Sequence, residues 1–308
     1  NFVRIEPKHI TGGSSSAASP FGAVYYAVPD VVTNYNAMIS SLRTRFYKGL
    51  SFIANYTFGK SLDTVSWEAP CACTNQTFPV DQDEEYGRSD FDTRHNMNFA
   101  AVWDIPFFSN QSTWQGKLLG GWQLGTIVTY NTGYPWTART AGCLQGATAG
   151  TSNFCDPRPT YYNGTAPLAN TNENFRNGGL FPGTYVSGVP CNNPGTNPDG
   201  CNTVFYTPIT TGDPFTQPPG VGRNTFFGPK YFATDLSIGK RFGLPNTGFW
   251  GEGAGLDLKF NFFNVFNQLN FAPFGANSNP THVDRAQFAM PTNGLSGRVG
   301  EFQARLSF

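Results

Sequence analysis

The residues best suited by type and spacing to chemistry are Asp90, Asp92 and His95, since a carboxylate and an imidazole can act together as base and acid. A strand through this segment would place Asp92 and His95 on opposite faces. No serine-centred motif with flanking glycines accompanies them. The sequence therefore predicts that the protein is not an enzyme.

A second set of charged residues alternates with apolar residues in several short stretches. Such charges could line the path of a ligand through a barrel. They could also neutralise one another across neighbouring strands, which every polar barrel interior needs, and this is the favoured interpretation. The set consists of Arg43, Arg45, Asp235, Arg241, Asp257, Lys259, Glu301 and Arg305.

Metal and cofactor chemistry has little support. The acidic run Asp81, Asp83, Glu84 and Glu85 could offer oxygen ligands to calcium, but it lacks the alternating spacing and the glycine of a calcium loop. A solvated acidic loop is the favoured interpretation. We expect no metal and no cofactor.

The cysteines favour disulfides in an oxidising compartment over a zinc site, because only three histidines exist and none lies near a cysteine. Proximity in sequence favours pairing Cys143 with Cys155 and Cys191 with Cys201, which leaves Cys71 and Cys73. All six cysteines lie in expected loops: Cys71, Cys73, Cys143, Cys155, Cys191 and Cys201.

The elements that must position these residues are strands, and the last eleven residues show the pattern most clearly. Phe302, Leu306 and Phe308 share one face of a strand, while Glu301 and Arg305 share the other, because side chains alternate with period two. An outer-membrane barrel strand is apolar on the lipid side and polar inside. A strand that ends on Phe resembles the signal by which the barrel assembly machinery recognises bacterial barrel proteins for insertion.

The composition agrees with a barrel. Of 308 residues 16 % are aromatic and only 13 % are charged, and 35 Gly and 23 Pro favour strands joined by turns over helices. The net charge of zero gives no indication of a nucleic-acid partner. No apolar run is long enough for a transmembrane helix, and no signal peptide is recognisable at Asn1, which predicts a mature protein or a fragment.

The expected fold is all-β: a segment of a larger antiparallel transmembrane β-barrel, with seven strands, or eight if residues 1–34 supply one. Residues 1–34 are expected to form a loop with one possible further strand, and residues 35–308 the barrel. Between strands, short connections alternate with long loops at about 59–91, 132–230 and 267–297, which places these loops and the cysteines outside the cell. The expected strands are 35–46, 50–58, 96–103, 122–130, 231–242, 256–262 and 298–308.

Four segments resemble the C-terminal barrel of TonB-dependent outer-membrane receptors, in particular the Oar-like group of Acidobacteria with a carboxypeptidase-regulatory-like domain. They are Asn34–Asp63, Asp90–His95, Gly222–Asn224 leading into Asp235–Phe242, and Asn261–Phe271. The resemblance implies a barrel of about 22 strands closed by a plug, which imports scarce ligands with energy delivered by TonB.

The chain departs from this family pattern, since it shows no TonB box or plug and about 22 strands do not fit in 308 residues. The expected function is a segment of a receptor that takes up a siderophore, carbohydrate or peptide. Its expected partners are outer-membrane lipid, the remaining strands and plug or copies of itself, and TonB through other parts. The alternative is a structural or adhesive surface protein, as a homo-oligomer of a processed barrel fragment.

Overall fold

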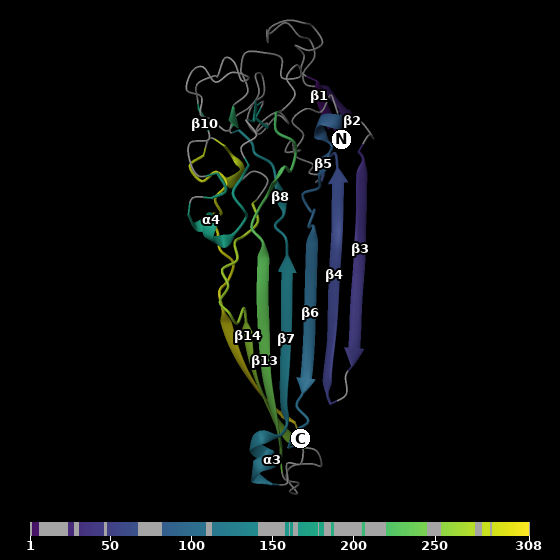
Figure 1. Ribbon diagram of the computed structural model, residues 1–308, viewed down its shortest axis with the longest axis vertical. Helices are drawn as coiled ribbons and strands as arrows, with labels where there is room; N and C mark the ends of the chain where they lie inside the picture. The colour runs from purple at the N-terminus through teal and green to yellow at the C-terminus, as the bar shows by residue number, and fades with distance from the viewer. Residues whose placement is uncertain are drawn as a thin grey trace, which may run out of the picture.

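The computed structural model consists of one long antiparallel sheet with loops gathered at one end (Figure 1). Among the described residues, no helix is long and apolar enough to cross a membrane. The structure describes residues 2–5, 24–27, 31–45, 48–66, 82–108, 113–140, 158–159, 161–162, 166–177, 179–181, 186–187, 205–206, 220–244, 254–274, 279–283 and 285–307.

The sheet contains the seven long strands that the alternation predicts, and their order is β15-β14-β13-β7-β6-β4-β3. Each long strand therefore lies beside the long strand that precedes it in the chain, and all the pairs are antiparallel. The strands are β3 (Thr33–Arg45), β4 (Leu50–Asp63), β6 (His95–Asp104), β7 (Trp122–Asn131), β13 (Tyr231–Gly243), β14 (Gly255–Phe263) and β15 (Val299–Ser307).

The register confirms the two faces that the sequence predicts. Phe302 lies opposite Phe260, with ring centroids 4.8 Å apart, and Leu306 lies opposite Leu256. One face, called the outward face here, carries an apolar row on every strand, and the inward face carries the polar rows. Phe308 lies outside the described residues.

Short and long connections alternate strictly along the sheet. The short ones, residues 46–49, 105–121 and 244–254, and the C-terminus lie at one end, called the turn end (Figure 1). The long ones connect β4 to β6, β7 to β13 and β14 to β15, and their described residues lie at the opposite end, called the loop end. The first long loop begins at Thr64 and not at 59, because β4 continues to Asp63 by pairing with Thr33 and with β5 (Gly87–Arg88).

The eighth barrel strand expected within residues 1–34 is not part of this sheet. Two short strands, β1 (Phe2–Ile5) and β2 (Val24–Ala27), pair with each other instead. Among the described residues β3 and β15 are therefore each paired along one side only. The sheet is open at both edges.

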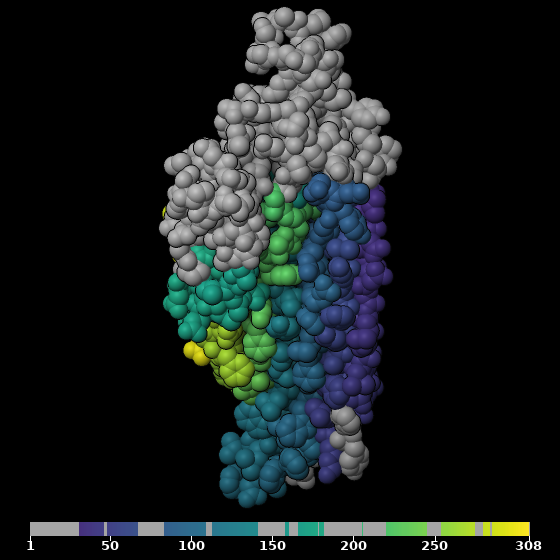
Figure 2. Space-filling model, turned by 45° about the horizontal axis from the view of Figure 1, so that its top comes forward, coloured from purple at the N-terminus to yellow at the C-terminus, as the bar shows by residue number. Residues whose placement is uncertain are grey.

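The loops pack into a body of their own, called the loop cap here. It contains α4 (Asn172–Arg176), the pair β8 (Pro135–Trp136) and β12 (Phe226–Phe227), and the set β9 (Tyr161–Tyr162), β10 (Val186–Ser187) and β11 (Phe205–Tyr206). In Figure 2 the α4 segment, coloured teal, borders the yellow-green end of the chain. The apolar core of the loop cap is formed by Trp136, Ala138, Phe175, Leu180, Phe181, Phe205, Val221, Phe226, Val283, Phe288 and Ala289.

The remaining helices are short. The single turn α2 (Gln82–Glu85) precedes β5 at the loop end, and the short 3-10 turn Asn279–Thr281 lies between β14 and β15. At the turn end, α3 (Trp114–Leu119) connects β6 to β7. Thr113 caps α3, because its side chain accepts a hydrogen bond from the Gly116 amide.

Candidate functional site

The inward face of the sheet gathers half of the predicted ligand-path residues near the turn end. Arg241 lies opposite Asp257, with Nε 3.8 Å from Oδ1, and Asp257 in turn lies opposite Arg305. Lys259 follows on the same face of β14. Positive and negative charges thus alternate across three neighbouring strands.

The other four predicted ligand-path residues lie elsewhere. Glu301 lies opposite Asn261 and accepts a 2.6 Å hydrogen bond from Gln303 Nε2. Asp235 is at the loop end of β13, where its carboxylate accepts a hydrogen bond of 2.8 Å from the Asn264 amide and so fixes the end of β14. Arg43 and Arg45 lie on the edge strand β3, opposite Ile53 and Ser51. Within the described part of the chain neither arginine takes part in an ion pair, and the structure does not bring them to the other charges.

Two hollows follow the inward face. One, of about 390 Å³, is lined by Val102, Ile127, Asp235 and Phe263 among others. The second, of about 480 Å³, is nearer the turn end, and its lining includes Asp104, Arg241, Asp257 and Lys259. This face is therefore furrowed along its length instead of filled by its own side chains.

At the loop end, two of the sequence motifs meet in a buried hydrogen-bond network. Asn224 donates from Nδ2 to Asp90 Oδ1 over 2.6 Å and to the Arg88 carbonyl over 2.8 Å. Two further hydrogen bonds join it to the Thr137 hydroxyl, which accepts from the Asn224 backbone amide at 2.8 Å and donates to Asn224 Oδ1 at 2.9 Å. Asn224 has φ of 53°, a left-handed conformation that asparagine tolerates. The motif around Asp90 and the motif around Asn224 thus tie β5 to β8.

Two buried arginines extend this network. Arg223 forms an ion pair with Asp63 and donates from Nε to the Glu85 carbonyl over 3.1 Å. Burial lowers the pKa of Arg223 to about 10, so the guanidinium stays charged at neutral pH. Arg158 forms a 2.7 Å ion pair with Glu85, and both side chains are fully buried. Burial lowers the pKa of Arg158, and Glu85 opposes this shift.

The structure corrects the interpretation of the acidic run as a solvated loop. Asp83 and Glu84 are exposed as expected, but Glu85 is buried because Arg158 reaches it from the long loop after β7. Within the described residues, no group of three or more His, Cys, Asp or Glu side chains could hold a metal ion. Asp81 and all six cysteines lie outside the described residues, so the disulfides stay predictions.

Asp92 and His95, the pair considered for acid–base chemistry, have separate partners. Asp92 accepts a 2.7 Å hydrogen bond from the Ser61 amide and forms a 3.3 Å ion pair with Arg88. His95 Nδ1 is 2.8 Å from the hydroxyl of Tyr56 on the outward face. No hydrogen bond among the described residues joins Asp92 to His95, so the geometry assembles no acid–base pair.

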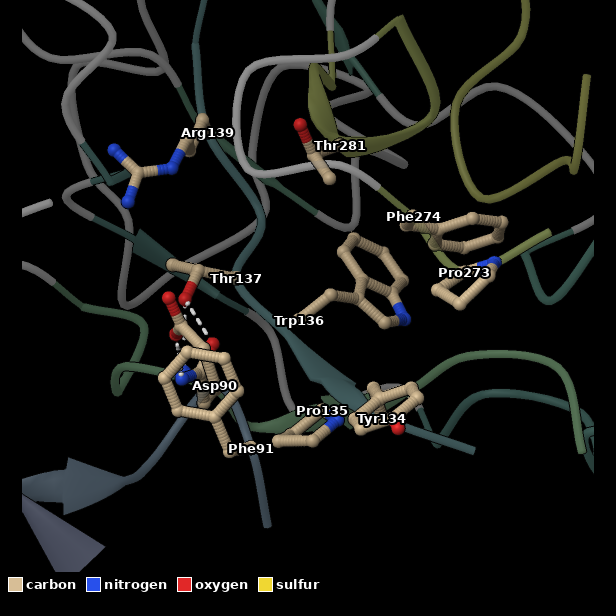
Figure 3. A pocket seen from close by; sticks show the side chains of 11 residues that line it. Asp90, Phe91, Tyr134, Pro135, Trp136, Thr137, Arg139, Pro273, Phe274 and Thr281 are labelled. Carbon is tan, nitrogen blue, oxygen red and sulfur yellow. Dashed lines mark hydrogen bonds between the residues drawn. The ribbon is translucent and has the colours of Figure 1, made fainter. Parts of the chain in front are cut away.

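A pocket of about 310 Å³ opens beside this network (Figure 3). Figure 3 shows Asp90, Thr137 and Arg139 on one side and the rings of Trp136 and Phe274 on the other, 5.3 Å apart between centroids. Pairing of β8 with β12 holds Trp136 in place, and Arg139 is held by backbone hydrogen bonds to residues 281 and 283. Sequence analysis missed this pocket, whose only signal is the aromatic and proline-rich run from Tyr134 to Trp136.

Aromatic residues in the long loops can form a binding surface or a core, and Phe181 is a core residue of the loop cap, stacked on Phe288 at 5.7 Å. Trp67 and Tyr185 lie outside the described residues, and the side chains of Tyr161 and Tyr162 are not described. The aromatic surface is therefore found where the sequence gave least indication of it, at the pocket beside Asp90.

Comparison with known proteins agrees with the architecture. The family model of the outer membrane beta barrel domain matches residues 4–301, which is nearly the whole chain. Neither the curated proteins nor the solved structures gave a match. The apolar outward face, the polar inward face and the sorted connections are what a strand array needs in a bacterial outer membrane. The chain belongs to the outer membrane beta barrel domain family.

Proposed function

We propose that this sheet forms part of the wall of a TonB-dependent receptor that takes up a scarce or bulky ligand. The observation that carries the proposal is the furrowed, charged inward face. The Arg241 side chain is 61 % exposed and that of Asp257 39 %, and the hollows continue toward the loop end. A small structural barrel fills its interior with side chains, whereas this face leaves room for a plug or a ligand.

The open edges of the sheet support a larger barrel. Backbone groups of β3 and β15 that lack strand partners would be exposed to lipid, where each unsatisfied group costs several kcal/mol. Further strands must therefore cover both edges. We propose that these strands belong to the same receptor, because covering both edges would close the sheet into a barrel around its charged inward face.

The pocket in the loop cap favours a carbohydrate among the three ligand classes. Its charges, Asp90 and Arg139, balance each other, which suits a neutral ligand better than an anionic ferric chelate. Tyr134 and Phe91, the exposed rings of the pocket lining, offer faces on which a sugar ring can pack its C–H groups, and the carboxylate can accept from its hydroxyls. Such a pocket at the loop end would meet the ligand before it reaches the inward face.

The test is growth of the source bacterium with either a limiting oligosaccharide as carbon source or a limiting ferric chelate as iron source. We expect deletion of the gene and deletion of TonB to abolish growth on the same oligosaccharide, with ferric chelate use unaffected. Normal uptake of both nutrients in the deletion strain, together with lost cell-to-cell adhesion, would instead establish the structural and adhesive alternative.

A matched pair of variants tests the pocket separately. Tyr134→Ala removes a pocket wall, whereas Phe266→Ala removes a more exposed ring that does not line the pocket. We expect Tyr134→Ala to raise the oligosaccharide concentration needed for half-maximal growth by about tenfold, the loss of one stacking contact of about 1 to 1.5 kcal/mol. Equal effects of the two variants would contradict the assignment of the pocket.

A further inference from the structure

A lysine lies on the apolar outward face, near the turn end of the sheet. Lys240 is opposite Trp122 on one neighbouring strand and Leu258 on the other, in the same row as Ile238 and Phe242. Its side chain is only 6 % exposed. A charged side chain on the lipid face of an outer-membrane barrel is destabilising in proportion to its depth. Something must therefore compensate this ammonium group.

The compensation comes from the C-terminal end of α3. Lys240 Nζ donates a 3.0 Å hydrogen bond to the Leu118 carbonyl and a further one to the Gly120 carbonyl. These belong to the carbonyls that a helix leaves unsatisfied, at the negative end of its dipole. The ammonium group also lies 4.9 Å from the centre of the Trp122 ring and 5.0 Å from that of Phe242.

This contact fixes α3 against the outward side of the strands. The Trp122 indole donates a second hydrogen bond, of 3.2 Å, to the same Leu118 carbonyl. The chain after the helix packs tightly, because a Cβ at Gly120 would lie 1.9 Å from the Phe108 carbonyl oxygen. The six-residue helix is thus held at both its C-terminal end and its following turn.

Three of the five exposed side chains of α3 are apolar, and the exposed Gln115 and Lys117 are the polar members of the same surface. Trp114, Leu118 and Leu119 fall within an arc of about 140°, at 100° per residue. With Phe107 and Phe108 in the preceding turn they form a patch whose members are 47 % to 73 % exposed. These five residues are called the apolar foot. Exposed apolar clusters of this kind mark contact surfaces.

We propose that the apolar foot lies in the headgroup region of the periplasmic leaflet, and that a phospholipid monolayer is its partner. The foot continues the outward row of Trp122, Lys240 and Phe242, on the apolar face that an outer-membrane barrel turns toward lipid. The turn end faces the periplasm, since outer-membrane barrels have short periplasmic turns. Tryptophan and phenylalanine favour the interface when the helix that carries them lies in its plane.

Positioning the apolar foot is a role that explains a lysine at position 240 of an otherwise apolar row. A cation reaching from the outward row to the helix carbonyls holds α3 at one height relative to the strands. The exposed Lys117 lies on the adjoining side of the helix, within reach of lipid phosphates. This inference depends on membership of the barrel family and not on the proposed transport.

Fluorescence quenching in lipid vesicles tests the proposal. The protein, purified from outer membranes, is reconstituted in phosphatidylcholine brominated either near the carbonyl groups or deep in the acyl chains. The signal of Trp114 is obtained by subtracting the spectrum of Trp114→Phe, whose folding is checked by heat-modifiable migration. We expect stronger quenching by the shallow bromines. Quenching by aqueous acrylamide instead, or shielding from both agents by a protein partner, would overturn the proposal.

Variants at Lys240, whose ammonium group binds carbonyls at the C-terminal end of α3, provide a second test of the proposal. Lys240→Met removes the ammonium group that holds α3, and we expect it to lower the bromine quenching of Trp114 by about twofold or more as the helix leaves its position. Lys259→Met removes a lysine from the inward face of the neighbouring strand and should leave the quenching unchanged. Equal quenching in both variants would show that Lys240 does not position the foot.

Discussion

The buried ion pair between Arg158 and Glu85 gives the sharpest test of how the loop cap is stabilised. Both side chains are fully excluded from solvent, and Arg158 also donates a 3.1 Å hydrogen bond to the Val221 carbonyl. Removing one partner of a buried pair leaves the other charge uncompensated, at a cost of about 3 to 5 kcal/mol. Glu85→Ala should therefore destabilise the cap by that amount.

The loss of loop-cap stability expected in Glu85→Ala can be measured from the local opening of the cap. A loss of about 3 to 5 kcal/mol raises the open population of the cap roughly 150-fold to 4,000-fold. Hydrogen exchange of the Gly220 amide reports this directly, because it donates to the carbonyl of Pro159, the residue next to Arg158. The amides between β7 and β13 serve as internal controls, and their exchange should not change.

The double variant Arg158→Met/Glu85→Leu distinguishes a buried-charge effect from simple loss of packing. Replacing both partners with apolar side chains of similar volume is often neutral or stabilising. We expect Gly220 exchange in the double variant to return to within about tenfold of the parent protein. A double variant that opens as readily as Glu85→Ala would refute the reasoning, and so would a Glu85→Ala variant with unchanged exchange.

Three further predictions concern packing and backbone conformation. Phe205→Ala should destabilise the cap by about 3 to 5 kcal/mol, measured by the same exchange, while the control Phe91→Ala, at a largely exposed ring, should cost less than about 0.5. Asn224→Gly keeps the left-handed backbone but removes the side-chain hydrogen bonds, so exchange near Asp90 should rise about tenfold or more. Gly49→Ala should lower the yield of heat-modifiable protein in outer membranes, because a Cβ would lie 2.4 Å from a backbone oxygen at positive φ; unchanged yield would contradict this.

The sheet could be predicted from the sequence because period-two alternation is a local property. The order of apolar and polar residues within each strand shows which face is apolar. The faces of Phe302 and Phe260 can therefore be predicted without knowing that the two rings are in contact. Loop lengths then gave the sorting of connections. Strand ends were less predictable, since the last five residues of β4 pair with the first residues of β3 and the final two also pair with β5, a strand too short to show any pattern.

The loop cap could not be predicted because its contacts join residues distant in sequence. Phe175, Phe205 and Phe288 lie in non-periodic segments and become a core only when three-dimensional packing brings them together. Glu85 looked like a solvated carboxylate because its partner is 73 residues away. The motif residues Asp90 and Asn224 were recognised by resemblance, but their hydrogen bond to each other could not be inferred from it.

The composition of the cap core also has a consequence for the timing of assembly. Trp136 and Phe181 come from the loop between β7 and β13, whereas Val283 and Phe288 come from the loop before β15, so two strands separate the halves of one core. Trp136 therefore cannot contact Phe288, its ring neighbour at 5.6 Å, until both loops have been synthesised and β13 and β14 have brought them to the same end of the sheet. Formation of the cap core thus depends on prior pairing of the strands that separate its two halves.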